Sequence, residues 1–134
     1  MNENEKYILI IEDDYFTNEF YRVLFRKVKY PFIQSENGED ILNILSQKEI
    51  SLIILDINLK NTLLDKKKID GLELSKYIKE NFNSSSIPIL LVTAYRKNSN
   101  EDNFLEKSLA DDYITKPITD LNVFLEKVKM LKLK

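Results

Sequence analysis

Residues 52–58 read LIILDIN, so four consecutive apolar residues run directly into an aspartate, Asp56. A continuous apolar run of this length is typical of a β-strand that is covered on both faces. A carboxylate that closes such a strand has little water around it, so it requires a partner or a chemical task. A purely structural interpretation also exists, because aspartate is common where a strand turns into a loop. The residues around the other predicted strands decide between the two.

Length and composition limit the possible functions. The chain has 134 residues and only two glycines, and we expect residues 1–134 to form a single domain. The net charge of −2 argues against a general nucleic-acid binder. The absence of cysteine and histidine excludes disulfides, thiolate nucleophiles and the usual general base at neutral pH. Chemistry must therefore rest on carboxylates, lysines, hydroxyls or a hard metal ion.

Strand-like and helix-like segments alternate five times along the chain. The apolar runs predict strands at residues 7–11, 32–33, 52–55, 87–92 and 112–115. Apolar residues at helical spacing predict helices at 15–28, around 41–45, and at 74–82, 104–109 and 121–128. This alternation predicts an α/β fold, a five-stranded parallel sheet with helices on both faces. The run at 7–11 is too short for a signal peptide or a membrane span, so we expect a cytoplasmic protein without membrane insertion.

Polar side chains follow the carboxyl ends of four predicted strands. They are Glu12, Asp13 and Asp14 after the first strand, Asp56 and Asn58 at the third, Thr93 at the fourth and Lys116 at the fifth. Each has an ordinary explanation when taken alone: an acid after a strand often caps a helix, and threonine is a good strand former. However, open α/β sheets bind ligands outside the carboxyl ends of their strands. The joint pattern therefore favours a functional site that includes Asp56.

This constellation resembles the receiver domain of bacterial response regulators, the chemotaxis-type phosphoacceptor fold. The motifs that carry the resemblance are LIIEDD, ENGEDIL, LIILDIN, DGLEL, LLVTAY and DDYITKP, within a match from about Tyr7 to Lys129. The resemblance implies a flavodoxin-like (βα)5 fold with strand order 2-1-3-4-5. It also implies that Asp56 accepts a phosphoryl group from a sensor histidine kinase or a histidine phosphotransfer protein, forming an acyl phosphate.

Further roles follow from the resemblance. It implies a Mg²⁺ ion held by Asp13, Asp56 and the backbone carbonyl of Asn58, with Glu12 acting through water. The crowding of three acids is itself an argument for a cation, because like charges this close repel one another. Lys116 and Thr93 are expected to contact the phosphoryl oxygens.

The resemblance also implies a switch. Thr93 is expected to move toward the phosphoryl group and Tyr113 to turn inward, so that the fourth helix, fifth strand and fifth helix present an altered surface to a downstream protein target. The bond between Lys116 and Pro117 is expected to be cis. Tyr95, with Asn58 opposite, is expected to prolong the phosphorylated state by limiting access of water. We expect no direct contact with nucleic acid.

The stretch between Asp56 and Gly71 departs from the receiver pattern. The usual Met-Pro is absent, and residues 59–70 include an insertion with three consecutive lysines, Lys66 to Lys68. A solvated loop and a partner-selecting or site-covering element both remain open here.

Other functions fit less well. A phosphohydrolase of the haloacid dehalogenase type needs a second acid where Asn58 stands, and a flavodoxin needs a Ser/Thr/Gly-rich loop in place of EDDYF. The main alternative is a receiver-like protein-interaction module that works without phosphorylation. The chain is compatible with a stand-alone regulator, a phosphorelay intermediate or a receiver from a longer protein.

Overall fold

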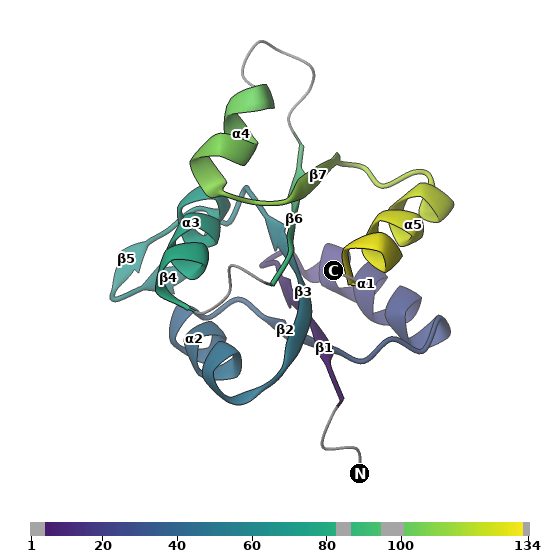
Figure 1. Ribbon diagram of the computed structural model, residues 1–134, viewed down its shortest axis with the longest axis horizontal. Coiled ribbons are helices and arrows are strands. Elements are labelled where there is room, and N and C mark those ends of the chain that lie inside the picture. Colours follow the sequence, from purple (N-terminus) through teal and green to yellow (C-terminus); the bar gives the residue numbers. More distant parts are fainter. Residues whose placement is uncertain (1–4, 83–86, 95–100, 133–134) are drawn as a thin grey trace.

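A five-stranded parallel sheet forms the centre of the molecule, with helices on both faces (Figure 1). The computed structural model describes residues 5–82, 87–94 and 101–132, with only the backbone of 101–104. The sheet strands are β1 (Tyr7–Ile11), β2 (Phe32–Ser35), β3 (Ile50–Asp56), β6 (Ile89–Thr93) and β7 (Asp112–Thr115). The helices are α1 (Tyr15–Lys27), α2 (Gly38–Gln47), α3 (Gly71–Asn81), α4 (Glu101–Ser108) and α5 (Leu121–Lys132). None of the helices in these described ranges is long and apolar enough to cross a bilayer.

The strand order is β2-β1-β3-β6-β7, which confirms the expected order 2-1-3-4-5 for the five strands of this sheet. The order reverses beside β1, because the chain moves first to β2 and then back to β3 on the other side. In the register of β1 against β3, Ile11 lies opposite Leu55. The next residue of each strand, Glu12 and Asp56, therefore emerges at the same edge of the sheet.

Both faces of the sheet are buried, which explains why the strands are continuous apolar runs. Alternate strand residues such as Leu9 and Ile53 pack with Ile41 of α2 and with α3 on one face. Their neighbours pack on the opposite face against a second cluster formed by α1 and α5. Figure 1 shows α1 and α5 together on one side of the sheet and α2 and α3 on the other.

Side-chain caps start the helices that follow the polar loops. Asp14 accepts a hydrogen bond from the backbone N–H of Thr17 at the start of α1, and Asn37 does the same at the start of α2. Asp70 and Glu73 form a reciprocal capping box at α3. The structural interpretation of an acid after the first strand therefore holds for Asp14, which leaves Glu12 and Asp13 for another role.

The bounds of several elements differ from the prediction by a few residues, and two differences bear on the site. The strand expected at 87–92 runs from Ile89 to Thr93, so that Thr93 is its last residue. The region 59–70 is not a simple loop, because β4 (Leu63–Leu64) and β5 (Lys67–Lys68) pair as an antiparallel hairpin. The two residues between these strands, Asp65 and Lys66, both have positive φ angles of 53° and 65°, the geometry of a tight hairpin turn that matches strand twist.

The core beside α1 yields a stability prediction. Phe25 is fully buried, and its ring lies near those of Tyr21 and Phe124. We expect Phe25→Ala to lower the free energy of unfolding by about 3–5 kcal/mol, because it leaves a cavity as well as losing apolar burial. Val23 on the same helix is 66% exposed, so Val23→Ala serves as the control and should change stability by less than about 0.5 kcal/mol. Urea unfolding followed by circular dichroism measures both values, and similar losses would contradict the assignment of the core.

Candidate functional site

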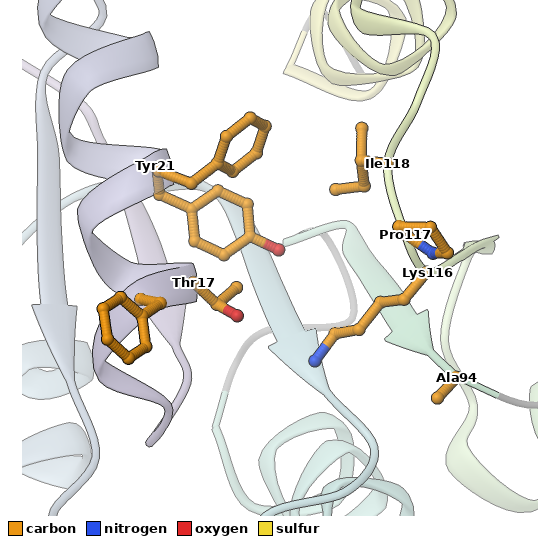
Figure 2. A pocket seen from close by; sticks show the side chains of 8 residues that line it. Thr17, Tyr21, Ala94, Lys116, Pro117 and Ile118 are labelled. Atoms are coloured by element: carbon orange, nitrogen blue, oxygen red, sulfur yellow. The ribbon is translucent and has the colours of Figure 1, made fainter.

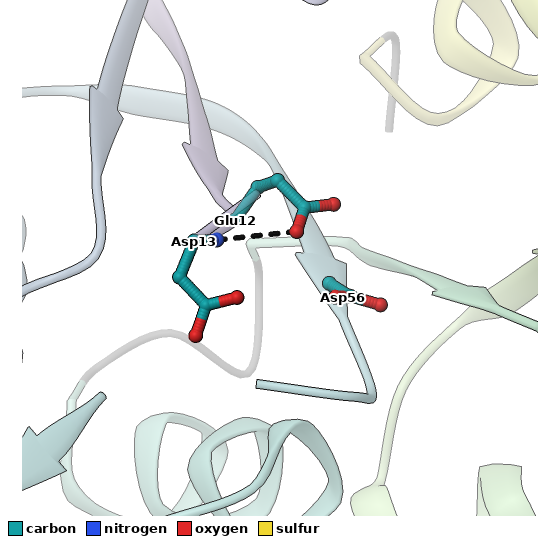
Figure 3. A group of neighbouring side chains, drawn as sticks. All are labelled: Glu12, Asp13 and Asp56. Atoms are coloured by element: carbon teal, nitrogen blue, oxygen red, sulfur yellow. Dashed lines mark hydrogen bonds between the residues drawn. The ribbon is translucent and has the colours of Figure 1, made fainter. Parts of the chain in front are cut away.

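Three carboxylates converge where β1 and β3 end (Figure 3). Glu12, Asp13 and Asp56 each offer an oxygen, and these oxygens lie within 4.8 Å of one another. The register of β1 against β3 brings Glu12 and Asp56 together, and Asp13 follows on the connection to α1. Asp56 is only 4% exposed although it is an acid. The strand-end acids singled out in the sequence, Asp14 excepted, therefore form one cluster.

Backbone N–H groups bind the carboxylate of Glu12, and the neighbouring charge of Asp56 affects its pKa. Its Oε2 accepts hydrogen bonds from the backbone N–H groups of Asp13 and Asp14, both at 3.1 Å. Burial, followed by repulsion from the charge of Asp56, raises the pKa of Glu12 to about 7. The charges of Glu12 and Asp56 thus repel each other, and a cation would relieve that repulsion.

A positively charged side chain, that of Lys116, contacts two of the three acids. Lys116 follows β7, and its Nζ lies 3.2 Å from Oδ1 of Asp56 and 3.3 Å from Oε1 of Glu12. Burial lowers the pKa of Lys116, but the charges of Glu12 and Asp56 raise it, and the net pKa is above its usual range. The bond between Lys116 and Pro117 is cis, as expected. The two contacts of Nζ anchor the ammonium group next to Asp56 and Glu12.

The remaining predicted residues occupy different places around the cluster. Thr93 is buried at the end of β6, and its carbonyl oxygen accepts a 2.7 Å hydrogen bond from the backbone N–H of Lys116. The backbone N–H of Asn58 donates to Oδ1 of Asp56 at 3.2 Å. Tyr113 is half-buried on β7 and packs against the core cluster beside α2 and α3. Tyr95 lies outside the described residues, so its expected effect on lifetime stays a prediction.

Two contributors were not recognised from the sequence. The backbone N–H groups of Lys60 and Asn61 donate to Oδ2 of Asp13, at 2.7 and 2.9 Å. Main-chain donors have no side-chain signature, so no motif pointed to them. The second contributor is Tyr21, which lies within the helix expected at 15–28 and was not singled out from the sequence.

A pocket of about 580 Å³ adjoins Lys116 between α1 and the connection from β7 to α5 (Figure 2). It is lined by Phe16, Thr17, Phe20, Tyr21, Ala94, Lys116, Pro117 and Ile118. The hydroxyl of Tyr21 points toward this space, is buried, and has no hydrogen-bond partner within the described part of the chain. Burial, with added repulsion from Glu12 and Asp56, raises the pKa of Tyr21. The hydroxyl therefore stays protonated beside the acid cluster.

The donor set at the cluster suits a hard divalent cation. Mg²⁺ prefers oxygen ligands, needs only one or two direct carboxylates and keeps several waters. The three carboxylates supply such oxygens within one ion's reach of each other. A carboxylate that lies next to a bound cation and an ammonium group is also a competent phosphoryl acceptor. The cation and the ammonium group both neutralise negative charge on the oxygens of the incoming phosphoryl group.

Comparison with known proteins supports this interpretation of the fold. The polar-differentiation response regulator DivK of Brucella anthropi is 28% identical over 124 residues, which are 92% of this chain and 94% of that protein. A solved structure of a putative response regulator from Chloroflexus aurantiacus matches with a TM-score of 0.81 and 24% identity, over 98% of this chain and 100% of that one. The response regulator TrrA of Thermotoga maritima, solved in complex with Mg²⁺-BeF, has a TM-score of 0.74 and 28% identity, over 94% and 98% of the two chains.

A family model gives the extent of the relationship. The model of the response regulator receiver domain matches residues 8–129, which include β1 through most of α5. The matched region contains every strand end that contributes to the acid cluster and to Lys116. The chain therefore belongs to the response regulator receiver domain family of two-component signal transduction.

Proposed function

We propose that this chain accepts a phosphoryl group on Asp56 in a Mg²⁺-dependent reaction and then acts as a signalling switch, as a phosphoacceptor rather than a conventional enzyme. The observation that carries the proposal is the environment of Asp56: a buried carboxylate at the end of the central strand, in an acid cluster and 3.2 Å from Lys116. We also propose that residues 1–134 act as one receiver unit, with a histidine kinase or a histidine phosphotransfer protein as donor.

The chemistry follows from these groups. A carboxylate oxygen of Asp56 forms a bond to phosphorus while the bond from phosphorus to the donor's imidazole nitrogen breaks, and that nitrogen regains its electron pair. A bound Mg²⁺ ion supplies positive charge to the phosphoryl oxygens. Asp13, Asp56 and the backbone carbonyl of Asn58 would hold it, with Glu12 acting through water. Lys116 neutralises a further oxygen, and the hydroxyl of Thr93 donates to another.

The surface around the pocket suits a phosphodonor protein. Phe16 on α1 is 78% exposed, and Tyr15 and Val23 on the same helix are exposed as well. Exposed aromatic residues beside a pocket are typical of protein-binding sites. Because the pocket reaches Lys116, a partner seated against α1 could bring its phosphorylated histidine to Asp56.

The switch would use the elements that follow Thr93 along the chain. Thr93 ends β6, Tyr113 lies on the neighbouring strand β7, and the two strands pair in parallel. Lys127 of α5 pairs with Asp112 of β7 at 2.8 Å, which ties helix and strand into one unit. We infer that phosphorylation shifts the population of packings of α4, β7 and α5, and that a downstream protein target recognises the altered surface.

Direct phosphorylation is the first prediction. Incubation with acetyl phosphate and Mg²⁺ should add one phosphoryl group to the protein, because Asp56 needs only a small donor and a cation to react. Intact-mass spectrometry measures the adduct. It should be absent from Asp56→Asn and from metal-free samples. A folded wild-type protein that binds Mg²⁺ but never gains the adduct would favour the phosphorylation-independent interaction module.

Thermal unfolding tests the metal site separately. Mg²⁺ at ten times its dissociation constant should stabilise the wild-type fold by about 1.4 kcal/mol, because the ion binds only the folded cluster. Asp13→Asn should lose most of this stabilisation. Asp14→Asn is the matched control: it keeps a good helix cap outside the acid cluster and should retain the full effect. Equal stabilisation of the two variants by Mg²⁺ would exclude Asp13 as a ligand.

A further inference from the structure

The inserted region 59–70 folds back on itself rather than extending into solvent. The hairpin of β4 and β5 is closed at its base by a 3.1 Å hydrogen bond from the N–H of Ile69 to the carbonyl of Thr62. Thr62 and Leu59 are buried although they belong to a polar stretch. The insertion is therefore an ordered part of the domain.

The hairpin is also seated on the body of the domain. A side chain at Gly38, the first residue of α2, would overlap the carbonyl group of Leu63. The absence of a Cβ at this position lets the hairpin backbone approach the start of the helix. Hence the start of α2 supports the hairpin at Leu63, which follows the segment between Asn58 and Thr62 directly.

The backbone of that segment donates hydrogen bonds to Asp13, one of the proposed metal ligands. Oδ2 of Asp13 accepts both main-chain hydrogen bonds, from Lys60 and from Asn61, across 47 and 48 positions of sequence. Hydrogen bonds from N–H groups to a carboxylate are among the stronger ones in proteins. Because both bonds use the same oxygen, Oδ1 stays available to a cation, and the carboxylate cannot rotate freely.

We propose that the inserted hairpin is a positioning element for the metal site, which orients Asp13 through the backbone N–H groups of Lys60 and Asn61. The inference rests on the proposed Mg²⁺-dependent function and adds a regulatory consequence. Coupling between two sites is reciprocal, so Mg²⁺ binding must also stabilise the docked hairpin. Anything that lifts the hairpin from α2 would weaken the site for Mg²⁺.

One matched pair of variants removes a single donor. Asn61→Pro lacks the backbone N–H, whereas Asn61→Ala keeps it and changes only an exposed side chain. We expect Asn61→Pro to raise the Mg²⁺ dissociation constant about tenfold, the low end of what the loss of an outer partner of a metal ligand costs, and Asn61→Ala to leave it unchanged. Isothermal titration calorimetry with MgCl₂ measures the constants, and circular dichroism confirms folding.

A second pair leaves the segment itself intact. Gly38→Ala adds a methyl group against Leu63 and should displace the hairpin, while Asn43→Ala, on the exposed side of the same helix, should not. We expect weaker Mg²⁺ binding for Gly38→Ala only. If Asn61→Pro prevents folding, this second pair still tests whether the hairpin positions Asp13 for Mg²⁺.

Amide exchange gives a readout that does not depend on phosphorylation. In the wild-type protein, Mg²⁺ should slow hydrogen exchange at the N–H groups of Lys60 and Asn61, and Gly38→Ala should abolish that protection. Equal or tighter Mg²⁺ binding by both Asn61→Pro and Gly38→Ala would overturn the positioning role and leave the phosphoacceptor function intact. A wild-type protein that binds no Mg²⁺ would instead overturn the proposed function, and the positioning role with it.

Discussion

The pairing of β1 with β3 is the constraint on which the rest of the structure depends. Its register places Ile11 opposite Leu55, and the next residues, Glu12 and Asp56, then share one edge of the sheet. A shift of one residue would exchange the side chains of a strand between the two buried clusters, and their close packing against the helices would be lost. The strength of the core thus determines the spacing of the carboxylates.

Electrostatic balance follows from that geometry. Placing buried acids side by side is unfavourable, as the raised pKa of Glu12 shows. Lys116 offsets part of this cost with two contacts near 3.2 Å, and its position depends on β7 pairing with β6 at the end of the sheet. A region that is 60 residues away in sequence from Asp56 therefore controls the charge around it. The remaining negative charge is what a divalent cation or a phosphoryl group with its cation would meet.

The hairpin at 59–70 lies in the stretch where the sequence departs from the usual receiver pattern. Its anchoring at Gly38 and its hydrogen bonds to Asp13 connect the start of α2 with the acid cluster. In the proposed metal site, the affinity for Mg²⁺ would depend on how well this hairpin is packed as well as on the ligands themselves.

Sequence alone determined much of this protein. The apolar runs and their alternation with amphipathic segments predicted the α/β sheet, because burial on both faces requires unbroken hydrophobic strands. The polar strand ends Glu12, Asp13, Asp56 and Lys116 indicated the site, since parallel strands end at a common edge. Only the tertiary structure revealed the hairpin, the N–H groups that hold Asp13, and the buried hydroxyl of Tyr21, which has no hydrogen-bond partner among the described residues. These features arise from backbone donors, close packing and contacts between segments that are distant in sequence. The order of side-chain types along the chain does not predict such contacts.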